Sequence, residues 1–488
     1  MSLTWWRNRT SRRKTRVERP KFRPQTEQLE DRLVMSVDVI LEWNAVMLQA
    51  NAVDHSGGVP DQGGPTRTAR AFAIVSAAMY DAYNSIENIG DPYLTQAPNS
   101  NNADSDAAVA QAARDTLVAL YPSQRAAFDA ALTQTLARIP NGTRENRGIA
   151  VGQFVANRIL QLRANDGSAN QDVPPYVPDP TVLGRHDVNP LNPGQGFLTS
   201  NWTRVTPFAL NDPRQFPAGK LGAQGVGSAT VDVTAFLNTI DYTTAYAEVR
   251  ALGGEGLRPD GTTITPTLRT AEQTEIGIFW GYDGSPGLGT PPRLYNQIAR
   301  TVAIQRNNTE AQNARLFTLL NLAMADAGIA SWTDKYDNNF WRPILGIRRG
   351  DEDANPFTDG DPTWRPLGAP RSNPFPGEIN FTPPFPAYTS GHATFGAAAM
   401  QILERFYNTS NITFTFISDE FNGITRDSRT GLPRTIEART YNSFDQAAAE
   451  NAQSRIYLGI HWQFDATEGI RTGALVANHV FNNFIRRN

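Results

Sequence analysis

Three short segments of the sequence contain residues whose types and spacing suit the binding of an oxyanion and the transfer of a proton. The first is Lys335-Tyr-Asp-Asn-Asn-Phe-Trp-Arg342-Pro343, which has two cations separated by seven positions. If the segment is helical, this spacing places Lys335 and Arg342 on one face of the helix, two turns apart. Pro343 disfavours helical backbone at the residue before it, so we expect the helix to end near Arg342. Taken alone, the two cations would be interpreted as surface residues.

The second segment is Pro386-Ala-Tyr-Thr389-Ser390-Gly391-His392, and an apolar stretch follows it. The spacing of apolar residues predicts a helix over 390–407 that begins here. The N-terminus of a helix has unpaired backbone N–H groups and the positive end of the helix dipole, so it favours an anion. Ser390 can add a hydroxyl donor, Gly391 allows close approach by the backbone, and His392 can exchange a proton near neutral pH. The alternative is that Ser390 only caps the helix and His392 is a surface residue.

The third segment is Ser454-Arg455-Ile-Tyr-Leu-Gly-Ile-His461-Trp-Gln-Phe-Asp465. On a helix, Asp465 could accept a hydrogen bond from one imidazole nitrogen of His461, which lies four positions earlier. That bond would fix the tautomer and leave the other nitrogen with an outward lone pair, as a metal ligand or a nucleophile requires. Arg455 offers a planar fork of donors that suits an oxyanion. A purely structural His–Asp pair is the alternative for this segment.

Helical patterning dominates the sequence around these segments. Apolar residues recur at spacings of three and four over 69–86, 107–120, 124–139, 145–164, 270–280, 292–306, 310–332, 443–458 and 465–486. Between about 165 and 265, clustered prolines with many Gly and Asn residues predict long ordered loops. A second Pro-rich connection spans 356–386. We found no run of alternating strands. The prediction is therefore an all-α protein in which residues 36–488 form one large helical-bundle domain after an N-terminal tail.

Composition and charge exclude several classes of protein. The chain has 488 residues, 40% of them hydrophobic and 19% charged, so it can bury a large core. A formal net charge of −3 gives no reason to expect a nucleic-acid partner. The sequence has no cysteine, which excludes disulfides and thiolate chemistry. No stretch of 18 or more apolar residues occurs, so we expect no membrane span.

The first 35 residues differ in charge from the rest of the chain. They contain ten Lys and Arg residues but only four Asp and Glu residues. We interpret them as a disordered or targeting tail in preference to a nucleic-acid arm. Within the tail, Glu27-Gln28-Leu29-Glu30-Asp31-Arg32-Leu33 resembles a short motif on exported proteins of planctomycete bacteria. That resemblance implies export to the periplasm, the cell surface or the medium.

Taken together, the three segments resemble the signature of the vanadium haloperoxidase and type-2 phosphatidic acid phosphatase superfamily. Their order is Lys-x6-Arg-Pro, Ser-Gly-His and Ser-Arg-x5-His-x3-Asp, and so many fixed types at fixed spacings make coincidence improbable. The resemblance extends over roughly 270–470 and is greatest to fungal-type vanadium chloroperoxidases. The further matching stretches are Phe279-Trp-Gly-Tyr-Asp283-Gly-Ser, Gly289-Thr-Pro-Pro-Arg-Leu-Tyr-Asn-Gln297, Ser331-Trp332 and Phe385-Pro-Ala-Tyr388.

The resemblance implies a role for each residue of the signature. His461 would ligate vanadium, and His392 would act as the acid–base group beside the apical oxygen. The other cofactor-binding residues, which would bind or donate to the equatorial oxygens, are Lys335, Arg342, Arg455, Ser390 and Gly391. Lys335 would also polarise bound hydrogen peroxide. The resemblance also implies supporting or pocket-lining roles for Asp283, the partner of Arg455, and for Asp465, Trp332 and Phe385. The sequence departs from the family at Thr389, where proline is usual, and this puts the rigidity of the chain entering the helix in doubt.

These roles imply a vanadate-dependent haloperoxidase that uses hydrogen peroxide to oxidise a halide to hypohalous acid, which halogenates small organic acceptors. Vanadate is the implied cofactor, and no haem, flavin or nicotinamide is needed. The same residues could instead serve a soluble acid phosphatase, with His461 as the nucleophile and His392 protonating the leaving group. A non-catalytic protein that only sequesters an oxyanion is a third possibility. His55, His186 and His479 lie outside any spaced set, so we expect structural or surface roles for them.

Overall fold

Apolar residues three and four positions apart produce the long helices of this protein. The computed structural model describes residues 38–169, 175–222, 231–374 and 378–486. Over these residues the α-helices are α1 Val39–Asp54, α2 Pro65–Glu87, α3 Ser105–Leu120, α4 Arg125–Leu136, α5 Thr143–Arg163, α6 Val233–Phe236, α7 Ile240–Leu252, α8 Ala271–Phe279, α9 Pro291–Gln305, α10 Glu310–Asn338, α11 Pro343–Arg348, α12 Gly391–Tyr407, α13 Phe444–Tyr457 and α14 Gln463–Asn483. Short 3₁₀ turns cover Pro122–Gln124, Ser200–Arg204 and Gly350–Glu352.

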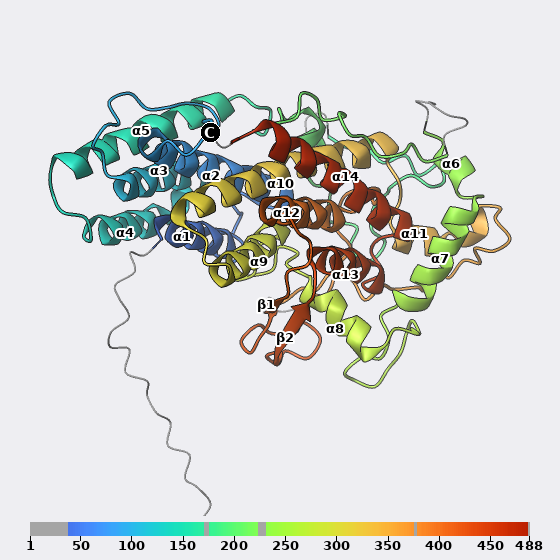
Figure 1. The fold of residues 1–488 in the computed structure, drawn as a ribbon. Coiled ribbons are helices and arrows are strands. Elements are labelled where there is room, and N and C mark those ends of the chain that lie inside the picture. Colours follow the sequence, from blue (N-terminus) through green and yellow to red (C-terminus); the bar gives the residue numbers. More distant parts are fainter. Residues whose placement is uncertain (1–37, 170–174, 223–230, 375–377, 487–488) are drawn as a thin grey trace, which may run out of the picture. The chain divides into compact units, whose positions relative to one another are not determined.

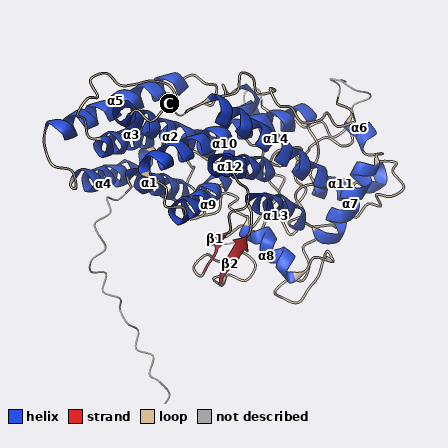
Figure 2. Cartoon of the chain, in the orientation of Figure 1, coloured by secondary structure: helices blue, strands red, loops and turns tan. Residues whose placement is uncertain are grey.

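The core of residues 38–488 is built on α10 and α12. Helix α12 packs against both α14 and α10, and α10 also packs against α2. On its other side α2 contacts α3, which in turn packs against α5 (Figure 1). Most of the 29 residues of α10 are buried, as expected for a helix with neighbours all round. The predicted all-α fold is confirmed, since among the described residues only one two-stranded antiparallel sheet interrupts the helices (Figure 2).

Several elements were missing from the sequence prediction. Helix α1 was not predicted, although its buried residues follow the helical spacing. Helices α6 and α7 lie within the region predicted to be loops, so that prediction was wrong for 233–236 and 240–252. The antiparallel strands β1 (Phe414–Asn422) and β2 (Ile436–Tyr441) were also missed. The first half of β1 alternates buried and exposed residues, which is a signal of period two in the sequence.

A buried carboxylate joins the loop at 208–210 to the middle of α10. Asp326 is fully buried and accepts the backbone N–H groups of Phe208, Ala209 and Leu210 at 2.6, 2.7 and 2.8 Å. We expect Asp326→Ala to lower the free energy of unfolding by about 3–5 kcal/mol, because three buried donors would lose a charged partner. Chemical denaturation measures this change. The control is Asp337→Ala, which removes partly exposed ion pairs with Arg214 and Lys220 and should change stability by about 1 kcal/mol or less.

Two further predictions concern the N-terminal tail and membrane-spanning helices. The basic tail of residues 1–35 and its export motif lie outside the described residues, so both stay predictions. Residues 38–488 group as one unit by their internal contacts. Among the described helices, none combines the length and the apolarity that crossing a bilayer requires.

Candidate active site

The start of α12 lies at the centre of the predicted site. Ser390 caps the helix, and its hydroxyl accepts the backbone N–H of Ala393 at 3.4 Å. The backbone N–H of Ser390 donates to the carbonyl of Asp465 at 2.9 Å, which joins this end of α12 to the start of α14. A side chain on Gly391 would press on Trp332, since a Cβ there would lie 3.1 Å from the indole. The predicted helix start is confirmed, and the predicted segment 386–392 meets the predicted segment 454–465.

His461 has a defined tautomer in this structure. Its Nδ1 lies 2.9 Å from Asp465 Oδ2, and its Nε2 lies 2.8 Å from Arg342 Nη1. A guanidinium can only donate, so Nε2 must carry the lone pair and Nδ1 must carry the proton given to Asp465. Burial, together with the charge of Arg342, holds the pKa of His461 well below its usual range and keeps the imidazole neutral. Nε2 is therefore available as a ligand or a nucleophile.

The predicted helical relation between His461 and Asp465 was wrong, although the contact itself is confirmed. Helix α13 ends at Tyr457 and α14 begins at Gln463, so His461 lies in the connection between them. Gly459 in that connection has a φ of +71°, a conformation that glycine adopts without strain. Asp465 is in the first turn of α14 and also accepts the backbone N–H of Trp462 at 3.0 Å. Burial raises the pKa of Asp465 to about 7.

Arg342 also lies outside the helix in which the spacing argument placed it. Helix α10 ends at Asn338, and Asn339 follows in the left-handed conformation with a φ of 52°. Arg342 then precedes Pro343, the first residue of α11. Its guanidinium nevertheless reaches the site, because Nε donates to the carbonyl of Phe385 at 2.9 Å and Nη1 donates to that of Ile460 at 2.8 Å. Burial lowers the pKa of Arg342 to about 9, so the group is cationic at neutral pH.

Arg455 forms the ion pair that the family resemblance implied. Its Nη2 donates to both carboxylate oxygens of Asp283, at 2.9 and 3.0 Å. Among the described residues, Nε and Nη1 of Arg455 and Nη2 of Arg342 have no hydrogen-bond partner although all three atoms are buried. A buried donor without a partner costs about 1–3 kcal/mol or more if it is charged. These N–H groups therefore favour a ligand with several acceptor oxygens.

Lys335 is fully buried in the last turn of α10, close to the other cations. Its ammonium donates to the carbonyls of Pro386 and Ala387 at 3.0 Å each and to that of Thr389 at shorter range. It also lies 5.1 Å from the ring centre of Phe385. Lys335 thus belongs to the cluster, but it binds the chain that leads into α12 and does not line the pocket. Its role toward peroxide stays a prediction.

Thr389, where the sequence departs from the family, takes part in the same contacts. Its hydroxyl lies 3.0 Å from that of Ser331, one turn before Lys335 on α10. Ser331 and Lys335 therefore both hold the segment that enters α12. The hydroxyl pair compensates, in part, for the rigidity that a proline ring would give this position.

His392 binds a loop that the sequence analysis did not connect with it. Its Nε2 lies 2.9 Å from the carbonyl of Gly281, so Nε2 carries the proton and Nδ1 carries the lone pair. The carboxylate of Asp283 is 3.8 Å from the same nitrogen. Burial and the charge of Arg455 hold the pKa of His392 well below its usual range. The residue is a neutral imidazole able to accept a proton.

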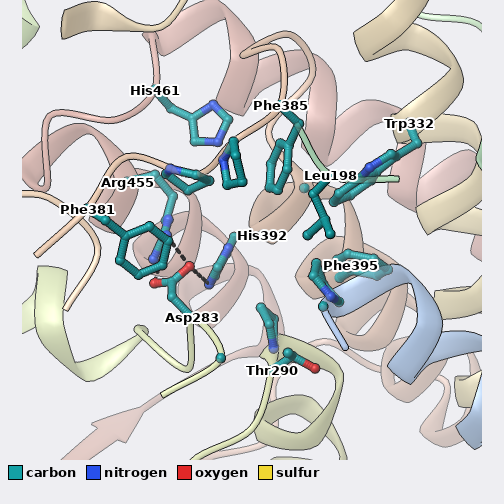
Figure 3. Close-up of a pocket in the computed structure, with 17 residues that line it drawn as sticks. Leu198, Asp283, Thr290, Trp332, Phe381, Phe385, His392, Phe395, Arg455 and His461 are labelled. Atoms are coloured by element: carbon teal, nitrogen blue, oxygen red, sulfur yellow. Dashed lines mark hydrogen bonds and ion pairs between the residues drawn. The ribbon is translucent and has the colours of Figure 1, made fainter. Parts of the chain in front are cut away.

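Several of these side chains line a pocket of about 90 Å³ (Figure 3). His461, Arg455, His392 and Asp283 form a polar wall, as the close-up shows. Opposite them is an apolar wall of Trp332, Phe385, Phe395 and Leu198. The Trp332 and Phe385 rings are 4.8 Å apart between centres. The site thus combines a cluster of cations and two neutral imidazoles with a surface that excludes water.

Two residues close to the cation cluster or to His392 were not predicted from the sequence. Gly281 contributes only a carbonyl, which no side-chain pattern reveals. His186 was expected to have a structural or surface role, and it is buried near Arg342 and Lys335. Burial and the charges of these two residues hold the pKa of His186 well below the usual range. Neither ring nitrogen of His186 has a hydrogen-bond partner among the described residues. Its position could not be found from the sequence, because about 150 residues separate it from Arg342.

The bond from His461 to Asp465 provides a test of the site that does not depend on turnover. We expect Asp465→Ala to weaken oxyanion binding by about 10- to 100-fold, since the tautomer of a ligating histidine depends on the partner of its other nitrogen. Isothermal titration of the purified protein with vanadate measures this affinity. Unchanged affinity in the variant would show that Asp465 does not orient His461.

Two family models match the chain. The vanadium chloroperoxidase N-terminal domain matches residues 27–195, and the second helical-bundle domain of the same family matches residues 315–487. Together they cover more than half of the chain. The N-terminal match also extends the resemblance well beyond 270–470, to residues that the motifs did not reach.

Individual relatives show the same likeness. A vanadium chloroperoxidase of Curvularia inaequalis is 34% identical over 511 aligned positions, which cover 88% of this chain and 79% of the relative. The crystal structure of a bacterial vanadium-dependent iodoperoxidase has a TM-score of 0.69 at 24% identity and covers 91% of this chain and 96% of its own. The holo form of a bacterial vanadium-dependent chloroperoxidase has a TM-score of 0.62 at 15% identity, over 90% and 97% of the two chains. The two bacterial structures share the fold.

Proposed function

The chain belongs to the vanadium chloroperoxidase family, and from this premise we propose that it is a vanadate-dependent haloperoxidase. Hydrogen peroxide, a halide ion and a proton are converted to hypohalous acid and water, and the hypohalous acid halogenates small organic acceptors. The observation that carries the proposal is the neutral His461, whose Nε2 lone pair meets the guanidinium of Arg342 inside a buried cluster of cations.

The residues present fit a vanadate ion. His461 Nε2 would be the single protein ligand to vanadium. The unpartnered N–H groups of Arg342 and Arg455 would donate to its oxygens, together with the Ser390 hydroxyl and the Gly391 amide at the start of α12. Asp283 pairs with only one nitrogen of Arg455, and three buried nitrogens of the Arg342 and Arg455 guanidinium groups have no partner among the described residues, so the cluster favours an anion. When bound, vanadate supplies a pentavalent Lewis-acid centre that activates peroxide.

Side chains of the pocket accept the proton from peroxide and exclude water. His392 offers its Nδ1 lone pair as the base for the proton of incoming hydrogen peroxide, because Gly281 holds Nε2 in the protonated form. The Trp332 and Phe385 rings keep water from the polar wall, which strengthens every charge interaction there. Asp283 keeps Arg455 in place and compensates part of its charge.

The depressed pKa of His392 predicts the pH dependence of the reaction with peroxide. Because the pKa in the folded protein is lowered, the neutral base persists below the usual value of 6.5 for histidine. We expect kcat/KM for hydrogen peroxide to stay high from neutral pH down through 6.5 and to fall only at lower pH. Initial rates measured across the acid range show the pH at which kcat/KM falls. A fall in kcat/KM with its midpoint at or above pH 6.5 would contradict the assignment of His392 as the base.

An acid phosphatase activity would use the same residues, so one preparation is assayed in two ways. Halogenation of a dimedone-type acceptor is measured with peroxide, halide and added vanadate. Hydrolysis of a chromogenic phosphate ester is measured without vanadate. We expect halogenation to be the principal activity and to depend on vanadate. Strong ester turnover without halogenation would overturn the proposal, and inactivity in both assays would support a binding protein.

Export is a separate proposal, which is supported only by the motif at residues 27–33. Fractionation of cells that express the full chain, with and without these seven residues, tests it. We expect the intact chain outside the cytoplasm and the shortened chain within it.

A further inference from the structure

The first strand of the hairpin holds the loop that joins α8 to α9. Three consecutive β1 residues contact that loop or the last residue of α8 before it. Ser418 Oγ donates to the carbonyl of Phe279 at 2.7 Å, and the backbone N–H of Asp419 donates to the Tyr282 hydroxyl at 2.7 Å. Glu420 Oε1 accepts the backbone N–H of Tyr282 at 3.2 Å, across 138 positions of sequence. The hairpin, which plays no part in the oxyanion cluster, is therefore bound to a loop that does.

Glu420 contacts the loop from a buried position. It is fully buried, and its Oε2 accepts Arg434 Nη1 at 2.6 Å and, at shorter range, the hydroxyl of Ser372. Its Oε1 also lies where a side chain on Gly281 would be, since a Cβ there would be 2.5 Å from it. Tyr282 has a φ of 54°, which is uncommon for a residue other than glycine and needs support from its surroundings. The carboxylate of Glu420 provides that support.

The loop held in this way carries two groups of the active site. The carbonyl of Gly281 accepts the Nε2–H of His392 at 2.9 Å. Asp283 accepts Nη2 of Arg455 and lies 3.8 Å from the same nitrogen of His392. Glu420 is bonded to the residue between Gly281 and Asp283. A shift of this loop would move the acceptor of His392 and the partner of Arg455 together.

We propose that Glu420 is a positioning residue for the acid–base group, because it fixes the Gly281 carbonyl that selects the Nε2–H tautomer of His392. The inference rests on the proposed haloperoxidase function. With the tautomer fixed, the Nδ1 lone pair is always available to take a proton. Without it, a fraction of the molecules carries the proton on Nδ1 and cannot accept another from peroxide. Glu420 touches neither the cofactor-binding residues nor the pocket, so its hydrogen bonds reach the site through the loop.

The test combines a spectroscopic measurement on the vanadate-free protein with kinetics. Nitrogen-15 NMR of histidine-labelled protein reports the tautomer of each imidazole, and the chain has only five histidines. We expect His392 to be an Nε2–H tautomer in the wild type and a mixture of tautomers in Glu420→Gln. In the haloperoxidase assay we expect kcat of Glu420→Gln to fall by about 10- to 100-fold, because a small displacement of a catalytic group has an effect of this size. The KM for halide should change by less than about threefold. The matched control is Glu437→Gln on β2, which removes the charge of a glutamate whose hydroxyl partner is Thr435 and should change neither measurement.

Two results would overturn the proposal. One is a Glu420→Gln protein that folds, as judged by its melting curve, and retains the wild-type tautomer of His392. The other is a loss of kcat that is matched by Glu437→Gln. If Glu420→Gln does not fold, the variant Ser372→Ala is tested instead. That change removes one hydrogen-bond donor to Glu420 and keeps the charge of Glu420. Ser372→Ala should give the same tautomer change to a smaller extent, and no change would refute the proposal. A tautomer change without halogenation by the wild type would support the role of Glu420 and contradict the proposed function.

Discussion

Replacing His461 by alanine should abolish the retention of vanadate. The substitution removes the imidazole whose lone pair points at Arg342, which is the group we propose as the protein ligand to vanadium. Changes to residues that hydrogen-bond a metal ligand lower metal affinity by about 10- to 100-fold, so we expect removal of the ligand itself to lower it by at least about 100-fold. Equilibrium dialysis with vanadate, followed by elemental analysis of vanadium, measures the loss.

The control for His461→Ala is His479→Ala, which changes a partly exposed histidine on α14 that contacts Gln215. It should retain vanadate as the wild type does. Because Asp465 and Arg342 would lose a buried partner in His461→Ala, melting curves of both variants must show that each protein is folded. Equal retention by the wild type and folded His461→Ala would show that another group holds the oxyanion.

Replacing His392 by alanine should separate binding from turnover. His392 lines the pocket, but its bonded nitrogen faces the Gly281 carbonyl and not the cations. We therefore expect His392→Ala to retain vanadate to within a few-fold of the wild type. The halogenation kcat should fall by about 10²- to 10⁴-fold, which is the usual contribution of a general acid–base group. Dialysis and initial rates on the same preparation measure both quantities.

The opposite pattern would contradict the roles assigned to the two imidazoles. If His392→Ala lost vanadate and kept its turnover number per bound vanadium, His392 would be a binding residue. Gln is a useful second substitution at position 392, because its amide can still donate to the Gly281 carbonyl but cannot exchange a proton. We expect His392→Gln to be as slow as His392→Ala and to bind vanadate equally well.

The sequence predicted which residues come together at the site, because the residue types in each segment, in that order, are typical of few other kinds of site. Ser390 and Gly391 at the start of α12 were predicted from local chemistry alone, since capping residues and an apolar helix follow one another. Both helical arguments, by contrast, failed in detail. Arg342 and His461 reach the site from connections between helices, and their positions depend on tertiary contacts that no periodicity encodes.

The parts of the fold that escaped prediction are those stabilised by distant partners. Helix α7 lies within a stretch rich in proline and glycine, and its Tyr242 and Tyr246 are buried against Trp462 from the far end of the chain. The β1–β2 hairpin has weak alternation beyond its first residues, and its register shifts between Ile417 and Asn422. The carbonyl of Gly281 could not be foreseen at all, because any residue type offers one.

The central claim is that three distant segments of the chain enclose one oxyanion and bind it through His461. A crystal structure of the protein grown with vanadate, phased to show the anomalous signal of vanadium, tests it most directly. The proposed arrangement requires a single strong peak within bonding distance of His461 Nε2, with its oxygens within hydrogen-bond distance of Arg342 and Arg455. A vanadium peak elsewhere, or a fully loaded protein with no density joined to His461, would contradict it.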